Sequence, residues 1–281
     1  MNTSTIYRKA VAVLAVTLAL MPAVARSQTL RGDFNMDGRV SIGDVTSMIN
    51  YLLNGTPGEA LPDCQVTYTV NGVNFTMVRV EGGTYMRTLG NPWTVEDFSI
   101  GQTEVTIELW NAVMDSVPEI NMMTKPQNPV ERVSWDDCQE FITRLNAMTG
   151  ENFRLPTENE WEYAACGGRL TLAYTYAGSN EINPVAWYVS DLPPVEENVP
   201  FSYYTRTQPV GTKAPNELGL YDMSGNVAEW VLKFREISTI GDYSPVRGGG
   251  AQSYASDCTV LSGFSCEHSK KALYIGFRLA L

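Results

Sequence analysis

Apolar and polar residues alternate along short stretches of the chain from about residue 66 onwards. Residues 73–80 alternate most regularly, and the glycine-containing residues 81–84 indicate a turn directly after them. This pattern predicts short strands that are separated by frequent turns.

Three segments combine a helical spacing of apolar residues with a capping residue. Thr106 is the expected N-cap of the first helix, and Ser134 with Asp137 marks the start of the second. Thr157 and Glu160 have the spacing of a capping box at the start of the third. The second helix carries an apolar stripe made of Cys138, Phe141, Ile142 and Leu145. Few helices among many short strands predict an irregular α+β domain with little regular secondary structure, rather than a parallel sheet.

The first 27 residues have the composition of a secretory signal peptide. Arg8 and Lys9 precede the apolar residues 10–20, and small residues lead to expected cleavage after Ala25 or Ser27. The apolar run is too short to cross a bilayer as a helix. We therefore expect an exported protein without a membrane span, located in the periplasm, at the cell surface or in the medium.

Acidic side chains outnumber basic ones, 31 to 20, and the formal net charge is −11. Removal of the signal peptide makes the chain more acidic, because that segment contains basic residues and no acid. A surface of this charge repels nucleic acid and anionic lipid and attracts cations such as calcium.

Residues 28–57 contain a candidate calcium-binding loop that runs into a helix. Oxygen-bearing residues stand at the positions that an EF-hand loop uses for calcium, and Gly38 stands where that loop turns sharply. The expected ligands are Asp33, Asn35, Asp37, the carbonyl of Arg39, Ser41 and Asp44. Without a cation, the carboxylates of this loop would crowd one turn, so the sequence predicts a small EF-hand-like loop-helix that binds calcium.

This loop and helix resemble a dockerin repeat. Dockerins pair two such repeats to bind cohesin domains, whereas one repeat is found here. A calcium-stiffened N-terminal segment is therefore the favoured interpretation, with cohesin docking as the alternative. Residues 58–69 are interpreted as a linker to the main domain.

Six sequence blocks of the main domain, residues 70–281, resemble the formylglycine-generating enzyme family, also called the sulfatase-modifying factor family. The blocks occur in the family's order at residues 81–86, 128–137, 154–164, 209–230, 247–249 and 276–279. The resemblance implies an elaborated C-type-lectin-like fold that is poor in regular structure.

The resemblance also shows which catalytic residues are missing. Enzymes of the family convert a sulfatase cysteine to formylglycine with oxygen and a copper(I) ion held by two cysteines. Here the first cysteine position is Ser253 and the second is Cys258, while Gly250 and Ala228 replace a serine and a tryptophan of the family motifs. A serine hydroxyl is a hard, protonated ligand, whereas copper(I) prefers soft thiolates. We therefore expect neither copper nor catalysis at these positions.

Two further features are implied by the resemblance alone. A calcium site of the family falls on the side chains of Asp222 and Glu229 and the carbonyls of Gly225 and Val227. A disulfide of the family corresponds to Cys166 and Cys266.

The polar segment around Ser253 is the predicted ligand-binding surface. Its candidate residues are Gln252, Ser253, Tyr254, Ser256 and Asp257. The sequence thus predicts a non-catalytic recognition protein whose partner is an extracytoplasmic protein or a glycan. The alternatives are a formylglycine-generating oxidoreductase with a rearranged thiolate site at Cys258 and Cys266, and a cohesin-docked accessory subunit.

Overall fold

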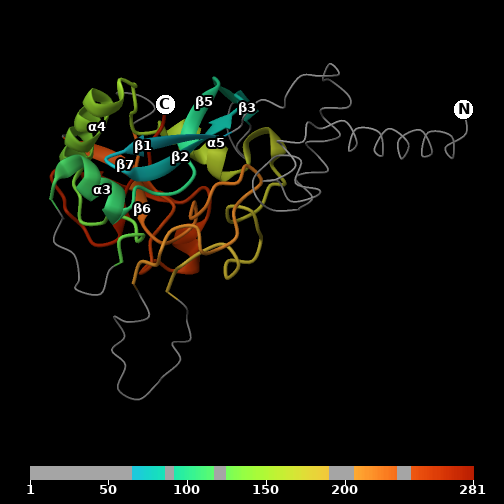
Figure 1. Ribbon diagram of the computed structural model, residues 1–281. Coiled ribbons are helices and arrows are strands. Elements are labelled where there is room, and N and C mark those ends of the chain that lie inside the picture. Colours follow the sequence, from blue (N-terminus) through green and yellow to red (C-terminus); the bar gives the residue numbers. More distant parts are fainter. Residues whose placement is uncertain (1–64, 86–91, 117–124, 190–205, 233–241) are drawn as a thin grey trace, which may run out of the picture. The chain divides into compact units, whose positions relative to one another are not determined.

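The alternating residues 73–80 form the central strand of a three-stranded antiparallel sheet. In the computed structural model, which describes residues 65–85, 92–116, 125–189, 206–232 and 242–281, this strand is β2 (Val73–Val80). It pairs with β1 (Gln65–Val70) and β5 (Phe98–Gly101) (Figure 1). The strand contributes Met77 to one hydrophobic cluster and Val78 to another, so it connects the two parts of the core.

Two more sheets lie in the described part of the chain. The smaller one joins β3 (Gly83–Tyr85) to β4 (Trp93–Val95) in antiparallel fashion. The larger one has the order β8-β7-β6-β9. Strand β7 pairs antiparallel with both β8 and β6, whereas β6 pairs parallel with β9. Its strands are β6 (Ala228–Trp230), β7 (Tyr243–Arg247), β8 (Gly263–Glu267) and β9 (Ile275–Gly276).

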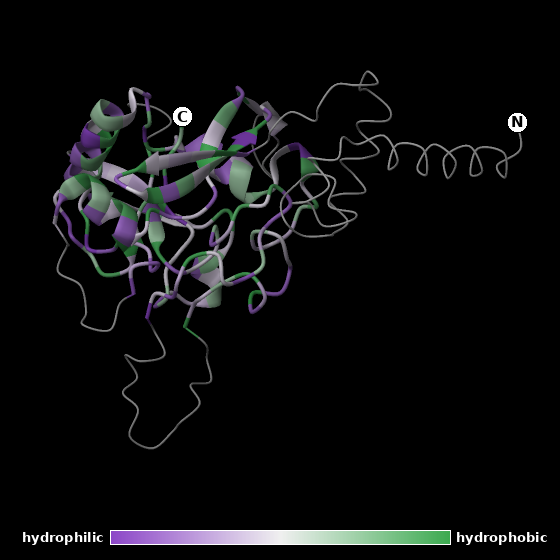
Figure 2. Ribbon diagram, in the orientation of Figure 1, coloured by the Kyte–Doolittle hydropathy of each residue, from purple (hydrophilic) through white to green (hydrophobic). Residues whose placement is uncertain are grey.

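The three predicted helices are confirmed. They are α3 (Ile107–Met114), α4 (Trp135–Thr149) and α5 (Glu158–Ala165). The expected residues cap each of them, since Thr106 accepts from the first turn of α3 and both capping boxes are formed. The alternating purple and green segments of α4 in Figure 2 reflect its buried stripe. Two short 3₁₀ helices, η2 (Gly168–Leu170) and η3 (Ala255–Cys258), complete the helical content of the described residues.

The last described residues are bonded to strands and loops from far earlier in the sequence. Ser99 and Leu281 exchange both backbone hydrogen bonds at 2.9 Å, and Arg154 and Ala280 do the same at 2.9 and 2.7 Å. Residues 279–281 therefore extend the backbone pairing of β5, and Arg278 donates from Nη1 to the carbonyl of Gly101 in that strand.

Several predictions concern residues outside the described part. The signal peptide, the calcium loop from Asp33 to Asp44 and residues 58–64 of the expected linker all lie there. The rest of that linker, residues 65–69, is part of strand β1, so regular structure begins earlier than the expected domain boundary at residue 70. Within the described residues, no helix combines the length and hydrophobicity that a bilayer crossing requires.

Candidate functional site

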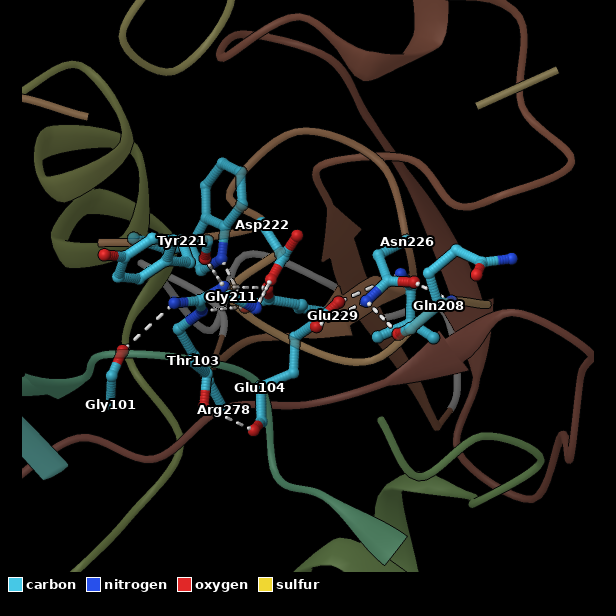
Figure 3. A network of polar contacts seen from close by, with 12 residues as sticks. Gly101, Thr103, Glu104, Gln208, Gly211, Tyr221, Asp222, Asn226, Glu229 and Arg278 are labelled. Atoms are coloured by element: carbon cyan, nitrogen blue, oxygen red, sulfur yellow. Dashed lines mark hydrogen bonds and ion pairs between the residues drawn. The ribbon is translucent and has the colours of Figure 1, made fainter. Parts of the chain in front are cut away.

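A fully buried ion pair lies at the centre of the main domain. Arg278 donates from Nε to Oε2 of Glu229 at 2.7 Å and from Nη2 to Oε1 at 2.6 Å (Figure 3). Trp161 of α5 adds a third hydrogen bond, from Nε1 to Oε2 of Glu229 at 2.7 Å. The remaining donors of Arg278 bond to the carbonyls of Gly101 and Tyr221. The pair thus joins β6, α5 and the C-terminal segment in one network.

Two more carboxyl groups face this pair. Burial, together with the charges of Asp222 and Glu229, raises the pKa of Glu104 well above its usual range. Burial also raises the pKa of Asp222 to about 6. Oδ2 of Asp222 accepts from the backbone of Gly211 at 2.7 Å, but its Oδ1 is buried without a hydrogen-bond partner. One arginine therefore compensates only part of the charge that three ionised carboxylates would bring.

The turn at residues 225–226 is fixed by the same network. A side chain at Gly225 would lie 2.3 Å from the carbonyl oxygen of Trp187, and its φ of +80° also requires glycine. Asn226 follows with φ +60° and donates from Nδ2 to Oε2 of Glu104 at 2.8 Å. Oε1 of Glu104 accepts from the backbone of Val227 at 3.0 Å, which holds the turn in place.

The residues expected to bind calcium in this domain do not fit a calcium ion as they are arranged. Both oxygens of Glu229 are already occupied by Arg278 and Trp161. Oδ1 of Asp222 is the one carboxylate oxygen of the expected ligand set that lacks a partner. In the described part of the chain, no group of three or more His, Cys, Asp or Glu side chains is placed to hold a metal. The Arg278 guanidinium thus binds one of the four ligands that the resemblance implied, Glu229. Calcium binding by the N-terminal loop stays a prediction.

A cavity of about 380 Å³ lies beside Ser253, between the segment at 250–253, β8 and the segment at 270–275. We call it the Ser253 cavity. Ala228, at the family's tryptophan position, forms part of its wall together with Cys266. The small side chain at 228 leaves room that a tryptophan would occupy. The positions at which the chain departs from the enzymes thus border a cavity.

Ser253 itself takes part in a tight turn. Its Oγ accepts from the backbone of Gly250 at 2.9 Å, and its backbone nitrogen donates to the carbonyl of Gly250 at 2.8 Å. A Cβ at Gly250 would lie 2.8 Å from the Cβ of Tyr274, so the serine of the family motif has no space here. The hydroxyl of Ser253 is therefore used to stabilise the loop.

Cys258 is poorly suited to metal binding. It is fully buried in η3, and burial, followed by the nearby charge of Asp257, raises the pKa of its thiol to about 12. A thiol with such a pKa is protonated at neutral pH in the metal-free protein, so a metal ion would have to displace that proton and enter a buried site to bind it. The Ser253 cavity is lined by Cys266 but not by Cys258.

The expected disulfide between Cys166 and Cys266 is not formed in the structure. Cys166 ends α5, and its Sγ lies 3.1 Å from the hydroxyl of Tyr85. Cys266 lies in β8 and lines the Ser253 cavity. The two thiols therefore belong to different surroundings.

The structure separates the five predicted ligand-binding residues into two groups. Gln252 and Ser253 line the Ser253 cavity, whereas Tyr254, Ser256 and Asp257 lie outside its wall. The sequence analysis missed the other side of the cavity, which includes Phe264, Lys270, Leu273 and Tyr274. Large apolar residues within an otherwise polar, loop-rich segment, Phe264 and Leu273, were the sequence signal that could have identified this side. In the structure they are 51% and 46% exposed.

The sequence analysis also missed Glu104. It is a lone acid between Thr103 and Val105, two residues before Thr106, the cap of α3. An acidic residue within an otherwise apolar and small stretch is a signal for a buried, hydrogen-bonded carboxyl group.

Comparison with known proteins identifies the family. Residues 66–281 match the family described as "Sulfatase-modifying factor enzyme 1-like domain". The "Chaperone protein LppX" of Paenibacillus barcinonensis is 34% identical over 202 residues, which cover 55% of this chain and 70% of LppX. The "Formylglycine-generating enzyme" of Thermomonospora curvata is 38% identical over 117 residues, which cover 40% of this chain and 36% of that enzyme.

A solved structure extends the similarity to three dimensions. "Treponema denticola variable protein 1" has a TM-score of 0.63 and 28% identity, and the match covers 80% of this chain and 99% of that one. The match to the Thermomonospora enzyme spans about a third of the enzyme's length, so it carries over no activity. The family match covers most of the present chain, including both halves of the buried network at Glu229 and Arg278. The chain therefore belongs to the sulfatase-modifying factor family.

Proposed function

We propose that this chain is an exported, non-catalytic member of its family that binds a partner at the Ser253 cavity. The observation that carries the proposal is the placement of Ser253 and Cys258. One is a hydroxyl bonded within its own loop, and the other is a buried, protonated thiol outside the cavity wall. Copper(I) needs two accessible thiolates, and these positions offer none.

The cavity has the properties of a binding surface. Phe264 and Leu273 present apolar side chains at about half exposure, and Lys270 adds a positive charge. Strand β8, which carries Phe264, is the edge of its sheet. Edge strands offer unpaired backbone groups to an extended polypeptide, and apolar pockets beside them select its side chains.

A polypeptide is the ligand class that we favour. LppX, a relative that matches over 70% of its length, is named a chaperone protein, and such proteins act on other polypeptides. An apolar cavity beside an edge strand suits the same kind of ligand. We therefore propose recognition of an extended segment of an extracytoplasmic protein.

The catalytic alternative predicts turnover, and our proposal predicts none. Incubation of the purified protein with copper, oxygen and a Cys-x-Pro-x-Arg peptide is expected to give no aldehyde by mass spectrometry. A Cys258→Ser variant should bind the same background amount of copper as the unchanged protein, because the buried thiol does not bind the ion. Formation of aldehyde, or copper uptake that depends on Cys258, contradicts the proposal.

Binding of an unfolded polypeptide tests the proposal that the Ser253 cavity recognises an extended segment of a protein. Fluorescently labelled α-lactalbumin, reduced and carbamidomethylated so that it stays unfolded, is expected to bind at physiological salt. Replacing Phe264 and Leu273 together by serine should weaken this binding about tenfold, because two apolar contacts are lost. Leu172→Ser is the matched control, since Leu172 is 62% exposed and lies outside the Ser253 cavity. An equal loss in the control, or no binding by the unchanged protein, contradicts recognition at this cavity.

A further inference from the structure

A second cavity, of about 780 Å³, lies between β3, the end of α5, η2 and the segment at 171–174. We call it the Tyr85 cavity. Its lining shares no residue with that of the Ser253 cavity. Its volume lies within the range of sites that hold small organic ligands, about 300–1,000 Å³. The proposed partner binding at the Ser253 cavity does not account for it.

Aromatic rings form one wall of this cavity. Tyr85 stands edge-to-face against Trp93, with ring centroids 5.1 Å apart and an interplanar angle of 63°. It also stands edge-to-face against Tyr163, at 6.3 Å and 85°. Tyr163 is buried, and its hydroxyl donates to the carbonyl of Glu81 at 3.2 Å, so the wall is held in place before any ligand arrives.

Glycines shape the same wall. A Cβ at Gly83 would lie 2.6 Å from the hydroxyl of Tyr163, so any larger residue would displace the ring. Gly168 begins η2 with φ +56°, a conformation that glycine adopts without strain. These positions keep the wall of tyrosines close to the backbone of β3 and η2.

The polar groups of the cavity carry no net charge. Arg169 is the one charged residue in the described lining, and its Nη1 pairs with Oε2 of Glu81 at 3.1 Å. Its Nε donates to the carbonyl of Gly82 at 2.6 Å. Thr84 and Thr171 add hydroxyl groups, each of which can donate and accept hydrogen bonds.

This combination points to one class of ligand. A free anion would need an unpaired cation and a quaternary ammonium ion an unpaired anion, and the lining offers neither because Arg169, its one charged residue, is paired with Glu81. A sugar ring has apolar C–H faces that pack on tyrosine rings, and hydroxyl groups that need both donors and acceptors at the edge. We propose that the Tyr85 cavity binds a neutral saccharide, with one ring against Tyr85 and Tyr174 and its hydroxyl groups directed to Arg169 and the two threonines.

The proposal is tested with a printed array of neutral and acidic oligosaccharides, probed with the full mature chain. Neutral glycans are expected to bind, and the strongest of them is then titrated by calorimetry. Tyr174→Ala should weaken its binding about tenfold through the loss of one aromatic face. Leu172→Ala, two residues away and outside the lining, should bind as the unchanged protein does. The variant with Phe264 and Leu273 both replaced by serine should also bind the glycan normally, which separates this site from the polypeptide site.

Cys166 supplies a second readout that needs no substitution, because it lines the Tyr85 cavity. Iodoacetamide labelling, followed by peptide mass spectrometry, is expected to slow several-fold at Cys166 when the glycan is bound. Labelling of Cys266 in the Ser253 cavity should stay unchanged and serves as the internal reference. An array with no neutral binder, binding of acidic glycans alone, or equal protection of both thiols overturns the proposal.

Discussion

Replacing Arg278 by methionine is expected to lower the free energy of unfolding by about 3–5 kcal/mol. The substitution leaves Glu229 buried without its cation and removes the donors that satisfy the carbonyls of Gly101 and Tyr221. An uncompensated buried carboxylate is far more destabilising than the loss of an exposed ion pair. The measurement is the urea midpoint together with its slope.

Arg144→Met is the matched control for this prediction. Arg144 pairs with Glu140 at 2.7 Å, but both side chains are about half exposed. Its replacement should change the free energy of unfolding by less than about 1 kcal/mol. If the single Arg278→Met variant does not fold, adding Glu229→Gln should restore part of the lost stability, because the unpaired charge is then removed. Equal effects of Arg278→Met and Arg144→Met contradict the central role of the buried pair.

The unchanged protein is expected to lose stability as the pH rises because Asp222 ionises, and an Asp222→Asn variant is expected not to show this loss. The folded state raises the pKa of Asp222 from 3.8 to about 6, so it holds the proton more tightly than the unfolded chain. Stability from this group is therefore fully present below pH 4 and is lost by the time the pH has passed 6. A shift of this size corresponds to about 3 kcal/mol. The difference in free energy of unfolding between the unchanged protein and the variant should fall by about that amount between pH 4 and 7.

Asp97→Asn is a control with the opposite sign. A backbone hydrogen bond from Gly82, followed by one from Arg79, lowers the pKa of Asp97, so this carboxylate stabilises the fold above its unfolded pKa and the contribution is lost on acidification. The pH series is measured with chelator and again with calcium. A constant difference between the unchanged protein and Asp222→Asn contradicts the prediction. A difference that rises with pH only when calcium is present would instead assign a metal to this site.

The local elements of the fold could be predicted because their signals lie within a few residues of one another. The caps at Ser134 and Thr157 each depend on a side chain three positions away, and β2 depends on its own alternation. The order of strands within the sheets could not be predicted in this way, because the pairing of β6 with β9, for example, joins segments far apart in the sequence. The spacing of apolar residues along the sequence does not indicate which distant strands pair with one another.

The same distinction applies to the site. The resemblance pointed to Glu229 as a calcium ligand, but it did not indicate that Arg278 would bond to both of its carboxylate oxygens. It assigned Cys166 and Cys266 to one disulfide, whereas folding carried them to two different cavities. The resemblance placed Ser253 at the position of the family's first catalytic cysteine, and the prediction drawn from it depends on the chemical difference between a hydroxyl and a thiolate rather than on where the residue lies in the fold.

The bonding of the final residues to β5 and to Arg154 has a kinetic consequence. Leu279 and Phe277 also accept from the backbones of Gly101 and Val105, so early and late parts of the chain must meet before either is complete. Contacts of such long sequence separation make folding slow, because most of the loop-closure entropy is spent before the contacts form. During synthesis, Gly101 and Val105 therefore lack these backbone partners until residues 277–279 have been made.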